Sequence, residues 1–361
     1  MKTILHTESS EGWGGQEIRI IRESLGMIKS GYRVIIAAPE QSNIFRRAKE
    51  LNIYTFPAQF QKKNPLSFVK ILSLINNEGV NIVNTHSSSD SWVATISARL
   101  SRVRPKVIRT RHLSTSISRS YLSRLIYNWL PDAIITTGEE IRQRMIMDNG
   151  FDAGKIFSIP TGIDLDMFNI EKVKPAIQRD GYAVGMVGVL RSWKGHNYFI
   201  EAIPLILKAI PDASFYIVGD GPQYRNIKGM IENLGLTGKV FMQGHREDIP
   251  EIIASLDVLV HPSYANEGVP QSILQAMAMQ RPVVASDAGA IKEAVIDEKT
   301  GFLIVPKKPE QIAERVIEFY RKPELRRKFG KEGRRFVKEN YSFEKMLDKI
   351  EALYKMLLSN A

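Results

Sequence analysis

Cysteine is absent from this chain of 361 residues. Without thiol groups the protein has neither a disulfide framework nor a thiolate nucleophile, which excludes a small secreted fold held together by disulfides. No apolar run approaches the roughly 18–20 residues that a membrane-spanning helix needs. No long apolar segment follows residues 1–6, so we expect a first β-strand there rather than a signal peptide, and a cytoplasmic protein.

Acidic residues are missing between Asp90 and Asp132, although the chain carries a net charge of +11 and this segment is rich in basic residues. Such a patch suits anionic lipid headgroups, phosphorylated substrates or nucleic acid. A solvated face with arginines at strand ends explains several of these side chains equally well. The basic residues are Arg99, Arg102, Arg104, Lys106, Arg109, Arg111, Arg119 and Arg124.

The dinucleotide-binding pattern Gly-x-Gly-x-x-Gly is absent from the first strand–loop–helix unit, whose loop contains Gly14 and Gly15. Two adjacent glycines let the backbone approach a ligand closely, although a plain turn between strand and helix explains them as well. The acidic residue at the usual distance from the glycines is also missing. Both absences speak against a Rossmann-type oxidoreductase.

Short apolar runs alternate with amphipathic segments of helical period along both halves of the chain. Continuous apolar strands that alternate with helices indicate a parallel sheet covered on both faces. At this length we expect about two domains. The sequence therefore predicts an α/β fold with two Rossmann-like, doubly wound domains at 1–168 and 181–341, joined by a polar linker at 169–180.

The loop that contains Glu267 joins an apolar strand to a helix that we expect to start at Pro270, because proline fits the first helical turn. The N–H groups of Gly268 and Val269, together with the helix dipole, would bind a diphosphate. Glu267 would accept hydrogen bonds from sugar hydroxyls. Gln275, a little over two helical turns further on, would reach a ribose. A simple helix-capping role for Glu267 stays open.

Two cations, Arg191 and Lys194, stand at the carboxyl end of the strand predicted at 184–188, just before a helix. Their charge-assisted hydrogen bonds to a diphosphate would contribute about 1.5–3 kcal/mol each. A solvated basic loop is the alternative. Ligands of parallel sheets bind beyond the carboxyl ends of the strands, where His86 and His112 also stand. Each of these histidines could instead serve as a structural hydrogen-bonding group.

Several motifs resemble those of the family 4 glycosyltransferases, which are retaining enzymes with the two-domain GT-B fold, here of the kind that builds bacterial surface polysaccharide or lipopolysaccharide. They are Asn-Glu-Gly-Val-Pro at 266–270, Pro-Val-Val-Ala-Ser at 282–286, Pro-Thr-Gly-Ile-Asp at 160–164, Lys-Gly at 194–195 and Gly-Asp-Gly-Pro at 219–222. The family usually has a second glutamate where this chain has Gln275, whose amide still hydrogen-bonds a ribose hydroxyl but carries no charge.

The resemblance implies two domains that face a cleft, with the last helix, 342–361, packed back on the first domain. It implies a nucleotide sugar bound mainly to the second domain, with no cofactor and no metal, so Asp164 and Asp166 are not expected to bind a metal ion. The resemblance assigns catalysis to His86, Glu267, Lys194 and Arg191. It assigns donor binding to Gly14, Gly15, Gly188, Gly219, His245, Arg246, Gly268, Val269 and Gln275. Acceptor or phosphate contact falls to Arg109, Arg111 and His112.

We therefore expect a glycosyltransferase that moves a sugar, with retention, to a glycan or lipid-linked acceptor. The basic segment favours an anionic membrane surface as a partner, at the inner face of the cytoplasmic membrane, and we expect no nucleic acid partner. Two other classes stay open. One is a catalytically idle scaffold with this fold that binds membranes, and the other is a Rossmann oxidoreductase. Hydrolysis of the donor sugar separates the enzyme from the scaffold, and nicotinamide absorbance tests the oxidoreductase.

Overall fold

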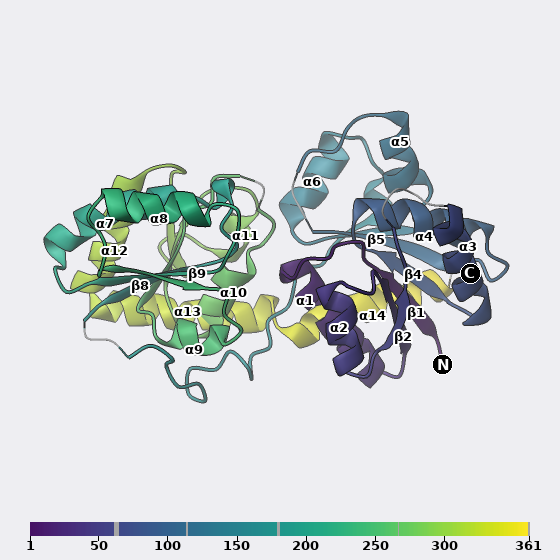
Figure 1. Cartoon of the computed structure of the whole chain (residues 1–361), viewed down its shortest axis with the longest axis horizontal. Coiled ribbons are helices and arrows are strands. Elements are labelled where there is room, and N and C mark those ends of the chain that lie inside the picture. The colour runs from purple at the N-terminus through teal and green to yellow at the C-terminus, as the bar shows by residue number, and fades with distance from the viewer. Residues whose placement is uncertain (61–64, 113–114, 179–180, 266, 360–361) are drawn as a thin grey trace. The chain divides into compact units, whose positions relative to one another are not determined.

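The computed structural model describes residues 1–60, 65–112, 115–178, 181–265 and 267–359 (Figure 1). Asn266 of the glutamate loop and the ends of the predicted linker and last helix, at 179–180 and 360–361, therefore lie outside the described residues. The chain divides into two compact units. Unit 1 comprises Met1–Thr161 and Glu344–Ala361, and unit 2 comprises Gly162–Phe343.

Unit 1 is built on a seven-stranded parallel sheet in the order β3-β2-β1-β4-β5-β6-β7. The order reverses between β1 and β4, which are neighbours in the sheet but far apart in the chain, and such a switch point is where doubly wound sheets bind ligands. The elements are β1 (Thr3–Thr7), α1 (Gly15–Lys29), β2 (Arg33–Ala38), α2 (Asn43–Glu50), β3 (Tyr54–Pro57), α3 (Pro65–Asn77), β4 (Ile82–Thr85), α4 (Ser88–Leu100), β5 (Lys106–Arg111), α5 (Tyr121–Arg124), a π-helical turn (Leu125–Trp129), β6 (Ala133–Thr136), α6 (Glu139–Met147) and β7 (Ile156–Ser158).

Unit 2 repeats the plan with six parallel strands in the order β10-β9-β8-β11-β12-β13, so its switch point lies between β8 and β11. The elements are β8 (Ala183–Val187), α7 (His196–Ala209), β9 (Ser214–Val218), α8 (Tyr224–Asn233), β10 (Val240–Gly244), α9 (Ile249–Ala254), β11 (Val258–His261), α10 (Gln271–Ala278), β12 (Val283–Ser286), α11 (Ile291–Ala294), β13 (Gly301–Ile304), α12 (Pro309–Arg321) and α13 (Pro323–Asn340), and α14 (Phe343–Ser359) follows them in the chain. The predicted fold of two parallel-sheet α/β domains is confirmed.

Each face of the sheet in unit 2 carries its own hydrophobic core, because alternate strand residues point to opposite faces. Val184 and Met186 of β8 pack with side chains of α7, α8 and α12, whereas Ala183 and Val187 pack with side chains of α9, α10 and α13. Figure 1 shows these two groups of helices on opposite sides of the sheet. Burial on both faces explains why the strands are apolar throughout.

The last helix, α14, belongs with unit 1 from Glu344 onward. Its Tyr354 hydroxyl donates to Oε1 of Glu23 on α1 at 2.9 Å. Gly26 of the same helix faces Leu347 so closely that an added Cβ would lie 2.4 Å from a methyl group of that leucine. Helices α1 and α14 therefore pack with almost no space between them at this position.

Several element boundaries differ from the predicted ones. The periodicity of apolar residues predicts helix starts near Ile18 and Trp92, but α1 begins at Gly15, and α4 begins at Ser88 because Ser87 and Asp90 form a capping box. Pro270 occupies the N-cap position, and α10 starts one residue later than predicted. Local hydrogen-bonding geometry decides these starts, and the periodicity of apolar residues does not record it.

The predicted linker packs against unit 2 over its described part. The Ala176 N–H donates to the carbonyl of Glu251 at 3.1 Å, and the Ile177 N–H donates to Oγ of Ser255 at 3.0 Å. The division between the units falls after Thr161, ahead of the predicted boundary at 168. Closer to that division, Oδ1 of Asp164 accepts two backbone N–H groups and shapes a turn.

Candidate active site

Two loops of unit 2 meet at the switch point between β8 and β11. The N–H of Tyr264, in the loop after β11, donates to the carbonyl of Trp193 in the loop after β8 at 2.9 Å. Gly195 has a left-handed φ of +76°, and a Cβ there would lie 2.1 Å from the carbonyl oxygen of Pro262. Only glycine permits this approach, and the approach brings the side chain of Lys194 onto the loop that contains Glu267.

Lys194 and Glu267 form an ion pair in which Nζ lies 2.8 Å from Oε1 and 3.0 Å from Oε2. Glu267 is only 6% exposed. Burial alone would raise the pKa of its carboxyl group, but the Lys194 ammonium and the neighbouring His261 ring outweigh burial and lower the pKa to about 2. The site therefore holds a carboxylate, with a cation fixed beside it, at neutral pH.

A buried chain of hydroxyl and imidazole groups supports the carboxylate. The Ser263 hydroxyl donates to Oε1 of Glu267 at 2.7 Å and lies 3.2 Å from Nε2 of His261. The Ser272 hydroxyl of α10 lies 3.3 Å from Nδ1 of the same ring. Because the Ser263 proton goes to Glu267, its oxygen accepts the Nε2 proton of His261, and Nδ1 is left to accept from Ser272.

The backbone after Glu267 presents N–H groups at the start of α10, as the sequence predicts. The carbonyl of Glu267 accepts the Ala290 N–H at 3.2 Å, and Gly289 packs directly against it. Neither Gly268 nor Val269 donates its N–H group to a backbone or side-chain acceptor among the described residues. Two N–H groups without a protein acceptor among the described residues therefore follow directly after a carboxylate that an ammonium group contacts, and such groups suit a phosphate group and a sugar hydroxyl.

The other residues of unit 2 that we predicted to bind the donor have surroundings different from those of Lys194 and Glu267. Arg191 is exposed, and its guanidinium group stacks on the Trp193 ring at 5.1 Å. Gln275 is half-buried on α10. Gly219 has a φ of +139° and leaves no room for a Cβ, which would lie 2.0 Å from the carbonyl oxygen of Gly188, so packing explains glycine at this position. A Cβ on Gly188 would meet nothing within 4 Å, and there the φ of +156° favours glycine instead.

The family resemblance implies that the loop with His245 and Arg246 lines the nucleobase of the donor, and this loop contains an ion pair. Nε and Nη2 of Arg246 donate to the two carboxylate oxygens of Asp248 at 2.7 and 2.5 Å, and His245 next to them is exposed. Asp248 does occupy the N-cap position of α9, but its side chain does not cap the helix. The position of Asp248 just before a helix predicts a capping role, and this prediction is wrong, because Arg246 binds the carboxylate instead.

In unit 1 the two predicted histidines join a third in a continuous chain. Nδ1 of His6 lies 2.9 Å from Nε2 of His86, and Nδ1 of His86 lies 3.1 Å from Nε2 of His112. Strand β1 brings His6 beside β4 at the switch point. The prediction placed His86 beside the donor sugar, but both of its ring nitrogens are occupied and the residue is only 5% exposed, so the half-buried His112 is the accessible end.

The predicted phosphate-binding arginines of β5 hold an aromatic ring. Arg109 and Arg111 project from the same face of the strand, and both donate to the Tyr127 hydroxyl, at 2.8 and 2.7 Å. The Arg109 guanidinium also stacks on the Tyr127 ring at 3.7 Å. Burial lowers the pKa of Arg109, which is 6% exposed. Arg109 therefore has a structural role in this arrangement, whereas Arg111 also lines a pocket described below.

The loop between β1 and α1 contains Gly14 and also Glu8, a titratable residue that the sequence analysis did not identify. Gly14 is the N-cap of α1 and has extended backbone, and a Cβ there would meet only ordinary contacts, so close packing does not require glycine at this position. Nearby, Glu8 at the end of β1 accepts from Gln16 and from the Ser10 N–H. Burial, reinforced by Asp90, raises the pKa of Glu8 to about 7. The position of Glu8 directly after strand β1 is the sequence signal that could have identified this residue.

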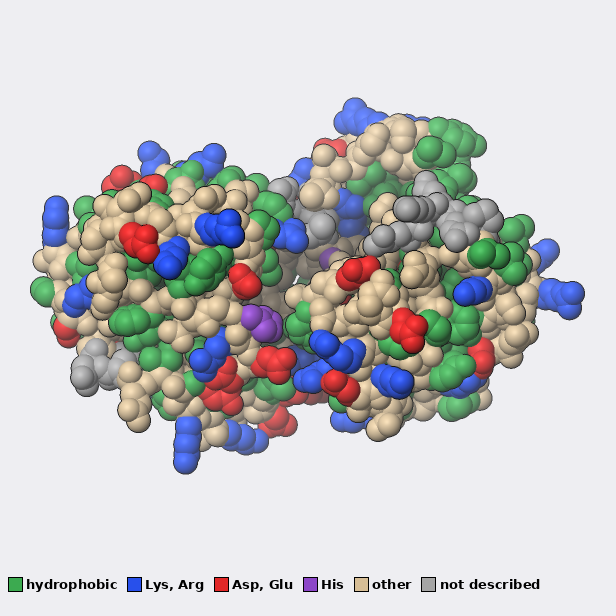
Figure 2. Space-filling model, in the orientation of Figure 1, with side chains coloured by type: hydrophobic (Ala, Val, Ile, Leu, Met, Phe, Trp, Pro, Cys, Tyr) green, Lys and Arg blue, Asp and Glu red, His purple; other side chains and the backbone are tan. Residues whose placement is uncertain are grey.

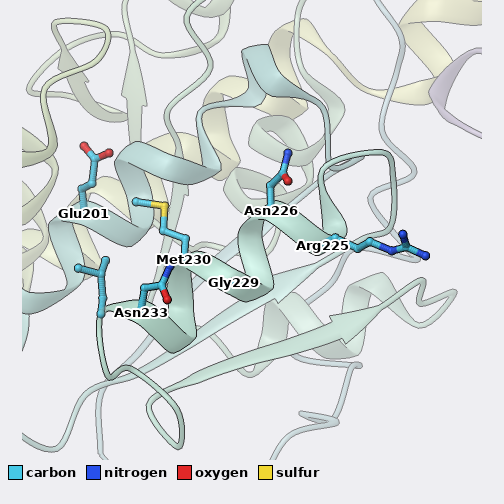
Figure 3. Close-up of a pocket in the computed structure, with 7 residues that line it drawn as sticks. Glu201, Arg225, Asn226, Gly229, Met230 and Asn233 are labelled. Atoms are coloured by element: carbon cyan, nitrogen blue, oxygen red, sulfur yellow. The ribbon is translucent and has the colours of Figure 1, made fainter.

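Two surface cavities lie outside the centre formed by Lys194 and Glu267. One of about 540 Å³ lies against α8, between Glu201 and residues such as Arg225 and Asn233, and Figure 3 shows that these side chains do not converge on a common point. The other, of about 240 Å³, is lined by Arg111, Arg119 and Arg144 together with Asp148 and six uncharged residues of the segments at 115–117 and 141–149. Only the second lies beside a strand end. No group of three or more potential metal ligands was found among the described residues.

Comparison with known proteins identifies the two halves of the chain. Residues 13–167 match the family described as Glycosyltransferase Family 4, and residues 167–336 match Glycosyl transferases group 1. A curated relative from Escherichia coli, UDP-Gal:alpha-D-GlcNAc-diphosphoundecaprenol alpha-1,3-galactosyltransferase, is 29% identical over 82% of this chain and 81% of its own length. The capsular polysaccharide biosynthesis glycosyltransferase CapM of Staphylococcus aureus is 22% identical over 82% of each chain.

Solved structures show the same fold over the whole chain. A glycosyltransferase from Rickettsia africae superposes with a TM-score of 0.89 at 23% identity and covers 100% of this chain and 99% of its own. Anabaena HepE, solved with UDP-glucose, superposes with a TM-score of 0.85 at 19% identity and covers both chains fully at 100%. Together with the two family matches, which span the chain from residue 13 to residue 336, this similarity shows that the protein belongs to the GT-B glycosyltransferases of family 4 and group 1.

Proposed function

We propose that this glycosyltransferase moves a sugar from a nucleotide-diphosphate sugar to an acceptor hydroxyl with retention of configuration and without a metal ion. The observation that carries the proposal is the centre formed by Lys194, Glu267 and the N–H groups of Gly268 and Val269. Anabaena HepE, whose fold this chain shares, was solved with UDP-glucose, which supports a nucleotide sugar as the donor. Glu267 would bind hydroxyls of the donor sugar, and Gln275 would bind the ribose.

In the reaction, the bond between the anomeric carbon and the diphosphate oxygen breaks, and negative charge grows on the leaving diphosphate. Lys194, Arg191 and the two N–H groups supply positive charge at fixed positions, which stabilises the transition state more than the bound substrate. Lys194 is held in place by Glu267 before the substrate arrives, so little reorganisation is needed.

Retention follows from attack on the same face that the diphosphate leaves. The acceptor hydroxyl forms a bond to the anomeric carbon, and its proton passes to an oxygen of the departing diphosphate. The described carboxylates leave this route open, because Glu267 is bound by Lys194 and Ser263 and its low pKa makes it a weak base. Analysis of the product anomer by NMR tests this proposal, and an inverted product would contradict it.

The acceptor that we propose is a lipid-linked glycan at an anionic membrane surface, of the kind named for the Escherichia coli relative. The pocket of about 240 Å³ lined by Arg111, Arg119 and Arg144 would receive an acidic group of that acceptor. None of the described helices is long and apolar enough to cross a bilayer. Attachment would therefore use the surface of unit 1.

The surface around α5 has the composition of a membrane-binding face. Tyr121 is 67% exposed and Trp129 is 49% exposed, and their rings contact each other at 5.0 Å. Aromatic rings of this kind favour the headgroup region of a bilayer, and neighbouring cations attract anionic lipids. Figure 2 shows basic and hydrophobic side chains together over the part of unit 1 where Figure 1 labels α5. Other exposed side chains next to Tyr121 in the chain are Arg119, Leu122 and Arg124, and the segment before β5 exposes Leu100, Arg102, Val103 and Arg104.

Two experiments test the donor and the membrane separately. Thermal shift with a panel of nucleotide sugars identifies the donor, because a bound ligand raises the apparent stability. Vesicles with anionic lipid should retain more protein at low salt than neutral vesicles, and the double variant Arg119→Ser/Arg124→Ser should lose most of this difference. The matched control Arg327→Ser/Lys331→Ser removes the same charge from α13 of unit 2. Equal retention by both vesicle types would contradict membrane attachment.

A further inference from the structure

The three histidines of unit 1 form a line that runs from the buried interior to the surface. The rings of His6 and His86 have centroids 5.2 Å apart, and those of His86 and His112 have centroids 5.3 Å apart. His6 is fully buried and His86 is nearly so, whereas His112 is half-buried. Among the described residues, Nδ1 of His112 has no hydrogen-bond partner, so the chain of rings ends there with a free nitrogen.

All three rings are neutral at physiological pH. Burial lowers the pKa of His86 and His112 well below the usual histidine value, and the charge of Arg19 acts in the same direction. Burial also lowers the pKa of His6, against an opposing effect of Glu23. A neutral imidazole has one N–H donor and one acceptor nitrogen. Both hydrogen bonds of the chain therefore form only when every ring donates in the same direction.

The buried end of the chain decides that direction. Nε2 of His6 lies 3.9 Å from Oε1 of Glu23 and has no hydrogen-bond partner. The Glu23 carboxylate is held by the Tyr354 hydroxyl at 2.9 Å and pairs with Arg19, whose Nε lies 3.8 Å from Oε2. A carboxylate attracts an N–H group and repels a nitrogen lone pair, and in a buried site this difference is only weakly screened.

The proton of His6 therefore belongs on Nε2, facing Glu23. Nδ1 of His6 must then accept the Nε2 proton of His86, and Nδ1 of His86 must accept the Nε2 proton of His112. This arrangement leaves Nδ1 of His112 without a proton, as an acceptor at the accessible end of the chain. The opposite arrangement would place a lone pair of His6 against the carboxylate.

We propose that Glu23 and His6 are positioning residues, which keep Nδ1 of His112 unprotonated so that it can accept a hydrogen bond from a sugar hydroxyl of the substrates. The proposal rests on the proposed function for the identity of the ligand. The direction of the protons rests only on unit 1, so its test does not depend on activity. His86 transmits the direction and does not itself contact the sugar.

NMR of the full chain labelled with ¹⁵N-histidine shows which ring nitrogen carries the proton, because ring ¹⁵N chemical shifts distinguish a protonated nitrogen from an unprotonated one. We expect His112 with its proton on Nε2, assigned through the variant His112→Asn. The variant Glu23→Gln removes the charge and should mix the two arrangements. The control Tyr354→Phe removes a partner of Glu23 but keeps its charge, and should leave the shifts of His112 unchanged.

A proton on Nδ1 of His112 in the unmodified protein would overturn the proposal, and so would equal effects of Glu23→Gln and Tyr354→Phe. The kinetic part compares His112→Ala with His112→Asn, whose side-chain oxygen replaces the Nδ1 acceptor. We expect His112→Ala to raise the KM for the substrate that supplies the hydroxyl by about tenfold, as for a lost hydrogen bond. His112→Asn should restore part of this loss.

Two substrates could supply the hydroxyl, and two assays separate them. Hydrolysis of the nucleotide sugar without acceptor reports on the donor alone, whereas transfer at saturating donor reports on the acceptor. A defect of His112→Ala in hydrolysis assigns the hydroxyl to the donor sugar, and a defect confined to transfer assigns it to the acceptor. Normal kinetics in both assays would overturn the role of His112, while the ¹⁵N result would still test Glu23 and His6.

Discussion

Replacement of Lys194 should affect stability and turnover through different groups. In the variant Lys194→Met the buried Glu267 carboxylate loses its cation, and burial then raises the pKa of Glu267 from about 2 toward or above its ordinary value of 4.5. A rise of 2.5 units in pKa corresponds to about 3 kcal/mol. We expect the free energy of unfolding of unit 2 to decrease by this amount at neutral pH. Turnover should fall as well, because the leaving diphosphate loses a fixed charge.

The double variant Lys194→Met/Glu267→Gln separates these two effects. The neutral amide removes the uncompensated charge, so most of the lost stability should return, whereas turnover should stay low because the cation is still missing and the Glu267 carboxylate is absent as well. Urea unfolding gives the stability, and donor hydrolysis together with sugar transfer gives the turnover. Normal turnover of Lys194→Met with every nucleotide sugar tested would refute the assignment of Lys194, and a recovery of turnover in the double variant would show that it acts only through Glu267.

The remaining predictions concern the loop, the exposed cation and pH. Gly195→Ala should destabilise unit 2 by roughly 2 kcal/mol or more, and should weaken donor binding in titration calorimetry, because φ is +76° and the added Cβ would lie 2.1 Å from the carbonyl oxygen of Pro262. Arg191→Ala should leave the urea midpoint nearly unchanged and lower kcat/KM at least about tenfold, and an unchanged kcat/KM would remove Arg191 from the site. Burial and the charge of Lys194 lower the pKa of His196 to about 3 in the folded protein, and the other buried neutral histidines also have folded pKa values below 6.5. Above pH 6.5 these residues are neutral in both the folded and the unfolded chain, so they do not reduce the stability. Each should cost up to about 1.4 kcal/mol per pH unit as the pH falls from 6.5 toward the folded pKa, and urea unfolding at pH 7 and pH 5 measures the loss, which a flat profile would contradict.

The sequence predicted the architecture because the apolar runs are continuous. Residues such as Val184 and Val258 are buried on a sheet that helices cover on both faces, so the strands show no polar alternation. The position of Lys194 and Glu267 was also predictable, since both follow a strand end and parallel strands expose their carboxyl ends at one edge. The contact between the two side chains was not predictable from the sequence, because it depends on a close approach of two loops that only Gly195 permits.

The histidine chain was only partly predictable for a related reason. His86 and His112 were visible at strand ends, but His6 lies 80 residues from His86 in the chain, and only the order of strands in the sheet brings them together. Which ring reaches the surface depends on side-chain packing, so His86 was favoured where His112 is the accessible ring. The buried ion pair of Arg19 and Glu23 on α1 has no sequence signal that separates it from an ordinary exposed pair.

The central claim is that unit 2 holds a diphosphate with the Lys194 ammonium and the N–H groups that follow Glu267. Titration calorimetry with a nucleoside diphosphate and with the corresponding nucleoside measures it most directly, in the unmodified protein and in Lys194→Met/Glu267→Gln, in which we expect the loop to stay folded. The account predicts that the diphosphate binds far more tightly than the nucleoside and that the double variant loses most of this advantage. Equal affinities for the two ligands, or an advantage that survives in the double variant, would contradict it.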